Sequence, residues 1–174
     1  MKKYLAILLP IILISGCRAT DNSHSLEERI ERLFASDYRA ECVAEITSNK
    51  TKNKYSYVCE KVSGGAYIID YGDMKITLSG EEALIEKNGE KISSPLSDGD
   101  LATVPEYFFN NYLNGGELKE TDDGYILECD IKDGSYYRHR ARMELSTNLH
   151  PENMSIKNKN GEEIIKIEIS KFSQ

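Results

Sequence analysis

Short segments in which apolar and polar side chains alternate constrain this chain more than any other feature of its sequence. Along Tyr38–Ser48 the even positions are mostly apolar and the odd positions are mostly polar, and Tyr55, Tyr57 and Cys59 alternate in the same way. A period of two places the apolar side chains on one face of a β-strand. Further strands are predicted over Ala66–Tyr71, Met74–Leu78, Glu117–Thr121, Tyr125–Ile131, Ser135–Leu145, Met154–Asn158 and Ile164–Phe172. Together these segments predict an antiparallel, meandering sheet with one apolar face.

Two Asn-Gly pairs mark tight hairpins, because this dipeptide favours the turn that joins two antiparallel strands directly. Asn160-Gly161 closes the last hairpin of the predicted sheet. Around Asn88-Gly89 the register pairs residues that suit each other: Lys87 with Glu90, Glu86 with Lys91, and Ile85 with Ile92. Two opposite-charge pairs and one apolar pair therefore support this register.

The first hairpin carries two of the cysteines. A turn centred between Lys50 and Thr51 keeps the apolar side chains on one face and places Cys42 opposite Cys59. Directly opposite Cβ atoms lie about 4.5–5.5 Å apart, and a disulfide needs about 3.5–4.5 Å. Cys42 and Cys59 are therefore a candidate disulfide, and two buried thiols are the alternative. With Cys129, three cysteines follow Cys17, so at least one thiol is free or pairs between chains.

Two helices are expected to cover the apolar face of the sheet. Ser25 and Glu28 form a capping-box pattern, and apolar residues at helical spacing follow, which predicts a helix over Leu26–Ala35. Pro105 suits an early helical position, and Gly115-Gly116 ends the aromatic run after it, which predicts a helix over Val104–Leu113. The fold class predicted is mainly β (α+β): a curved antiparallel sheet covered by one or two short helices.

The N-terminus has the pattern of an export signal. Two lysines precede the apolar run Leu5–Ile14, which is shorter than the roughly 20 residues that a membrane-spanning helix needs. The sequence Ile14-Ser15-Gly16-Cys17 resembles the bacterial lipobox, in which the cysteine receives a diacylglycerol. We therefore expect cleavage after residues 1–16, a lipidated Cys17, a tether over 17–24 and a domain over 25–174. The domain would be anchored on the extracytoplasmic side of the cell membrane.

Composition excludes some classes of partner. The chain has a formal net charge of −7, and removing residues 1–16, which carry two lysines and no acidic residue, makes it −9. This balance argues against nucleic-acid binding. The sequence contains no hydrolase or phosphate-loop motif, and His24, His139 and His150 are scattered. We therefore expect no enzyme activity, metal or cofactor, with His139 as a hydrogen-bonded core residue.

One row of basic residues is a candidate protein-binding surface. In the predicted strand Ser135–Leu145, Tyr136, Arg138, Arg140 and Arg142 share the outward face, whereas Tyr137 and His139 point inward with the apolar residues. Arginine and tyrosine are enriched in protein interfaces. The alternative is that these arginines pair with glutamates on neighbouring strands.

The closing segment resembles a known group of proteins. The last strands of LolA/LolB-like lipoproteins resemble three parts of this chain: Met143–Met154, Asn160-Gly161-Glu162 and a final strand that ends in Phe172. The turn differs in one respect, because His150 separates Leu149 from Pro151, whereas Leu directly precedes Pro in the family turn. The lipobox and the helix–hairpin opening resemble the germination lipoprotein GerS family. This resemblance implies a half-barrel wrapped over helices. It also implies a non-catalytic protein of the forespore or spore envelope.

The resemblance further implies a partner. GerS-type proteins bind and activate a zinc amidase of the CwlD type, which acts in muramic-δ-lactam formation in the spore cortex. No partner-binding residue is carried over by motif. A LolA-like carrier of lipid or lipoprotein is the alternative function, and an enzyme acting on peptidoglycan is a third. Exposed edge strands also allow a homodimer.

Overall fold

The computed structural model describes residues 25–96, 101–132 and 136–174. A helix, α1 (Leu26–Ala35), precedes six strands, and a second helix, α3 (Pro105–Leu113), precedes five more. The strands are β1 (Tyr38–Ser48), β2 (Thr51–Val62), β3 (Ala66–Asp70), β4 (Met74–Ser79), β5 (Glu82–Lys87), β6 (Glu90–Pro95), β7 (Glu117–Thr121), β8 (Gly124–Asp130), β9 (Arg140–Ser146), β10 (Pro151–Lys157) and β11 (Glu163–Ser173). Among the described residues, no helix is long and apolar enough to cross a membrane.

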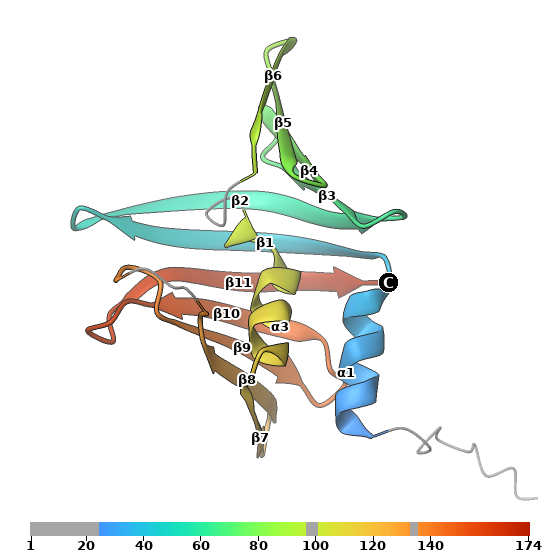
Figure 1. Ribbon diagram of the computed structural model, residues 1–174, viewed down its shortest axis with the longest axis vertical. Helices are drawn as coiled ribbons and strands as arrows, with labels where there is room; N and C mark the ends of the chain where they lie inside the picture. The colour runs from blue at the N-terminus through green and yellow to red at the C-terminus, as the bar shows by residue number, and fades with distance from the viewer. Residues whose placement is uncertain (1–24, 97–100, 133–135) are drawn as a thin grey trace, which may run out of the picture.

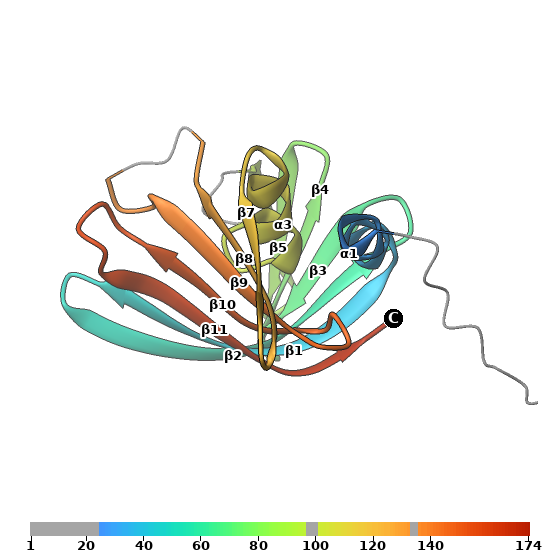
Figure 2. The same cartoon turned by 90° about the horizontal axis from the view of Figure 1, so that it is seen from below.

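All strands belong to one sheet, in the order β6-β5-β4-β3-β2-β1-β11-β10-β9-β8-β7. Every pair of neighbours is antiparallel, and β11 returns to lie beside β1. The sheet is open, with β6 and β7 as its edges, and it curves into a trough that holds both helices (Figure 1, Figure 2). The predicted fold class is confirmed. The unpaired edges are where a homodimer would form, and the homodimer stays a prediction.

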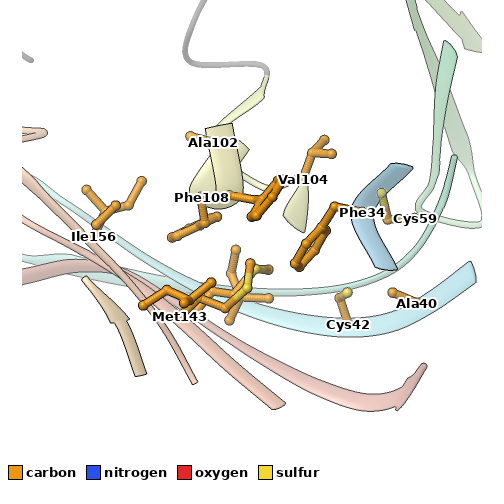
Figure 3. Close-up of a cluster of buried hydrophobic side chains, with 14 of the residues drawn as sticks. Phe34, Ala40, Cys42, Cys59, Ala102, Val104, Phe108, Met143 and Ile156 are labelled. Carbon is orange, nitrogen blue, oxygen red and sulfur yellow. The ribbon is translucent and has the colours of Figure 1, made fainter. Parts of the chain in front are cut away.

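The core lies between the concave face of the sheet and the two helices. Phe34 of α1 and Phe109 of α3 stack with ring centroids 4.5 Å apart. Phe34 and Phe108 reach toward the face formed by residues such as Cys42 and Met143 (Figure 3). The predicted capping box is present, because the Ser25 side chain accepts from the Glu28 backbone N–H and the Glu28 carboxylate accepts from Ser25 N–H. Its presence explains why α1 begins at the predicted residue.

The predicted register of the first hairpin is wrong by two residues. The turn lies at Asn49 and Lys50, which have φ of 49° and 65°, so Cys42 pairs with Tyr57 and Cys59 pairs with Ala40. A shift of two residues leaves every side chain on its predicted face, and Cys42 and Cys59 are both buried there. The structure holds them as free thiols, as it does Cys129, and the direct opposition on which the candidate disulfide depended is absent.

The long strand predicted over Ser135–Leu145 is shorter in the structure. β9 begins only at Arg140, Tyr136 and Tyr137 lie in a turn, and Ser135 lies outside the described residues. The backbone of His139 is held by two separate bonds, donating to Lys157 O and accepting from Ile131 N–H. The alternation therefore stops before Arg140. Tyr137, which was expected to point inward, has 69% of its surface exposed, and His139 is half-buried.

Most other short-range predictions agree with the structure, although the strand predicted over Met154–Asn158 is β10, which runs from Pro151 to Lys157. The register around Asn88-Gly89 is the predicted one, and α3 begins at Pro105, one residue after the predicted start. The signal segment, Cys17 and the tether lie outside the described residues, so they stay predictions, as do the domain boundaries.

Candidate functional site

A cavity of about 490 Å³ opens on the concave side of the sheet, between α3 and the strands β3 and β4. Tyr67 and Leu78 line it from the sheet, and Glu106 and Asn111 are among the residues that line it from α3. Ile131, Lys132 and Arg138, from the link between β8 and β9, complete the wall. This volume falls within the range of roughly 300–1,000 Å³ that is typical of small-molecule sites.

A buried ion pair between Lys61 and Glu106 includes one residue of the cavity wall, Glu106. The Lys61 ammonium on β2 lies 2.8 Å from Glu106 Oε2, and the two side chains are only 10% and 17% exposed. Lys61 Nζ also donates a 2.6 Å hydrogen bond to the carbonyl of Phe34 in the last turn of α1. One ammonium therefore joins the sheet to both helices, and it neutralises the one carboxylate among the described residues of the cavity wall.

Two tyrosines of β2 and β3 stay protonated at neutral pH: Tyr67, which bonds with Glu106 of this ion pair, and the buried Tyr57. Burial, and then the hydrogen bond with Glu106, raise the pKa of Tyr67 far above its usual value. Burial likewise raises the pKa of Tyr57, whose hydroxyl donates a 2.8 Å bond to the carbonyl of Thr103. A general base works best with a pKa near the operating pH, and the pKa of both hydroxyls lies far above it. We therefore assign these hydroxyls a hydrogen-bonding role.

The three buried thiols lack the character of nucleophiles. Burial raises the pKa of Cys42 to about 12 and that of Cys129 to about 11, and it raises the pKa of Cys59 as well. A reactive cysteine needs a lowered pKa and some exposure. In the part of the chain that the structure describes, no three His, Cys, Asp or Glu side chains gather in a way that could hold a metal ion.

The predicted basic row does not form one surface. Arg140 pairs with Glu128 on the neighbouring strand β8 at 3.2 Å, as the alternative expected. Arg142 pairs with Glu144 of its own strand at 2.7 Å. Arg138 instead lines the cavity, and Tyr136 is half exposed in the turn. Tyr136 and Arg138 do not lie in one row with Arg140 and Arg142, because the strand that would have aligned all four begins only at Arg140.

The sequence analysis missed an isoleucine row that crosses four strands. Ile69 pairs with Ile76, Ile76 with Ile85, and Ile85 with Ile92, so all four share the concave face of β3–β6. Ile69 is buried in the core, whereas Ile92 on the edge strand is 59% exposed. The row runs from the core onto the β5–β6 hairpin, which projects from the rest of the sheet (Figure 1). The predicted Ile85–Ile92 pair was the signal that could have revealed it.

Solved structures share this architecture. A chain in the structure of the CwlD amidase from Clostridioides difficile in complex with the GerS lipoprotein matches with a TM-score of 0.53 and 18% identity, over 87% of this chain and 97% of that chain. The two chains share a fold. An uncharacterized conserved protein from Thermus thermophilus matches with a TM-score of 0.54 and 9% identity, over 85% of this chain and 84% of that one.

A LolA superfamily protein from Nitrosomonas europaea also matches, with a TM-score of 0.44 and 9% identity, over 86% of this chain and 93% of that chain. No protein-family model matches the sequence, and no curated protein matches it either. The likeness to the two structures with TM-scores of 0.53 and 0.54 concerns the fold alone: an open, curved antiparallel sheet with helices in its hollow.

Proposed function

We propose that this chain is a non-enzymatic lipoprotein that resembles GerS and that binds and activates a cell-wall amidase of the CwlD type. Such an activator would act in muramic-δ-lactam formation and spore germination. The observation that carries the proposal is the isoleucine row, whose outer end at Ile92 is exposed, on a fold shared with a chain of the CwlD–GerS complex.

The isoleucine row has the chemistry of a protein-binding surface. Ile92 is 59% exposed at an unpaired sheet edge, and Tyr55 of β2, 44% exposed, lies on the same face of the sheet. Burying one isoleucine side chain contributes about 1.5–3 kcal/mol. A partner that covers the row would remove this apolar surface from water, and the polar ends at Lys87 and Glu90 would rim the contact.

The substitution Ile92→Asp tests this surface. We expect it to weaken binding of a purified CwlD-type amidase from the same cell at least about 30-fold, because it removes an apolar contact and buries an unpaired carboxylate. Binding is measured by calorimetry, and amidase activity is measured alongside. Leu113→Asp at the end of α3 is the matched control, since Leu113 is 51% exposed and lies away from the row. Unchanged amidase binding by the Ile92→Asp variant would refute this docking surface.

Membrane anchoring through Cys17 belongs to the same proposal. Two acyl chains make a stable anchor, whereas a serine at this position cannot form the thioether that carries them. We expect Cys17→Ser to move the protein from the membrane fraction to the soluble fraction of the producing cells. Recovery of the variant in the membrane fraction to the same extent as the unchanged protein would show that Cys17 is not the anchor.

A carrier of lipid or lipoprotein is the second candidate, and the cavity beside α3 favours it. Glu106 and asparagines in its wall, beside the leucines, make it a less apolar site than an acyl chain prefers. Acyl chains that copurify with the protein would favour this carrier function over the amidase-activator function.

A further inference from the structure

We propose that the cavity beside α3 binds a short acidic peptide, whose carboxylate lies against Lys132 and Arg138. The site is separate from the isoleucine row, and the proposed function does not need it. Three properties of the cavity wall carry the inference: its charge, its hydrogen-bond acceptors and its apolar patch.

The charged side chains that line the cavity include two cations, although the protein as a whole is acidic. The chain has a net charge of −7, yet the cavity is lined by Lys132 and Arg138, and the carboxylate of Glu106 in its wall is neutralised by Lys61. Arg138 already interacts within the fold, and its guanidinium carries five N–H donors, which suit a carboxylate that binds through both oxygens. The cavity therefore favours an anion.

The asparagines of α3 and its C-terminal cap favour a ligand that also donates hydrogen bonds. Asn111 Nδ2 donates to the carbonyl of Tyr107 at 2.8 Å, and Asn114 Nδ2 donates to the carbonyl of Asn110 at 2.9 Å. Each bond uses one of the two N–H groups of the amide, so both of these cavity-lining residues keep the Oδ1 atom as an acceptor and one N–H as a donor. A peptide has N–H groups for such acceptors, whereas the chain of a fatty acid has none.

The rest of the wall is apolar. Leu96, Leu101 and Tyr107 line it and are partly exposed, which gives small aliphatic side chains a contact surface. A ligand that combines a carboxylate, amide N–H groups and a small aliphatic side chain satisfies all three parts of the wall. Short acidic peptides have this combination. The stem peptides of peptidoglycan are of this class, and that choice of source rests on the proposed function.

Calorimetric titration with N-acetyl-L-alanyl-D-glutamate tests the site. We expect binding by the unchanged protein, and affinity about tenfold lower for Arg138→Gln and for Lys132→Gln, because each removes one charge-assisted hydrogen bond. The uncharged diamide of the same peptide should bind at least about tenfold more weakly than the dicarboxylate. Lys91→Gln is the matched control, since Lys91 lies on β6 outside the cavity wall and should leave affinity unchanged.

Three outcomes would overturn the peptide site: no heat of binding at millimolar peptide, equal affinity of the arginine, lysine and control variants, or binding of laurate in preference to the peptide. The last outcome would assign the cavity to an acyl chain. Amidase binding by the Arg138→Gln variant is measured in parallel. Retained amidase binding with lost peptide binding separates this site from the proposed function, and each can fail without the other.

Discussion

The variant Glu106→Gln is expected to lower the free energy of unfolding by about 3 kcal/mol. Removing one partner of a buried ion pair leaves an uncompensated charge, and this costs about 3–5 kcal/mol. We expect the lower end of this range because the Lys61 and Glu106 side chains are still 10% and 17% exposed to solvent, which partly screens the unpaired charge. Urea unfolding followed by circular dichroism measures the change.

The control is an exposed pair of the same chemistry. Arg39 and Glu60 lie 3.1 Å apart on neighbouring strands, with side chains 44% and 38% exposed. Glu60→Gln should change stability by less than about 1 kcal/mol, because solvent screens exposed pairs. The double variant Lys61→Met with Glu106→Leu should recover only part of the loss, because an apolar pair leaves no buried charge but removes the donor to the Phe34 carbonyl. A loss from Glu106→Gln no larger than that from Glu60→Gln would contradict the account.

Replacing Phe34 by alanine is expected to cost about 3–5 kcal/mol, which is the usual loss for a buried aromatic residue. Phe34 is 1% exposed, and its ring stacks on Phe109, so its loss opens a cavity between α1 and α3. The substitution should also loosen α1 before the sheet unfolds, because Phe34 is one of three buried residues through which this helix packs. Urea unfolding measures the first effect, and hydrogen exchange of the α1 amides measures the second.

Leu113→Ala is the matched comparison, because Leu113 is 51% exposed and its truncation leaves no enclosed cavity. We expect a change within about 0.5 kcal/mol for it. If Phe34→Ala were equally mild, α1 would not be packed on the core in solution as it is in the structure.

Local chemistry explains why much of the fold could be predicted. The capping box sets the start of α1, and Asn88-Gly89 sets the register of β5 with β6, since both act through residues close in sequence. The first hairpin was harder, because Asn49-Lys50 is an unusual pair for a turn with positive φ. A two-residue shift also keeps the same side chains buried, so the apolar pattern could not reveal the error.

The candidate sites depend on distant contacts. The cavity combines β3, β4, α3 and the link after β8, and the Lys61–Glu106 pair joins residues 45 positions apart. Arg138 was predicted to lie in an outward-facing row, but it lines the cavity, because β9 begins only at Arg140.

The sequence by itself determined which face of each strand is buried, where both helices lie and that the sheet is antiparallel, because periodicity and turn chemistry act locally. The tertiary structure decided which charges are paired, where a cavity remains and which end of the isoleucine row is exposed. These features depend on how far the sheet curves around its helices, and no local pattern encodes that curvature.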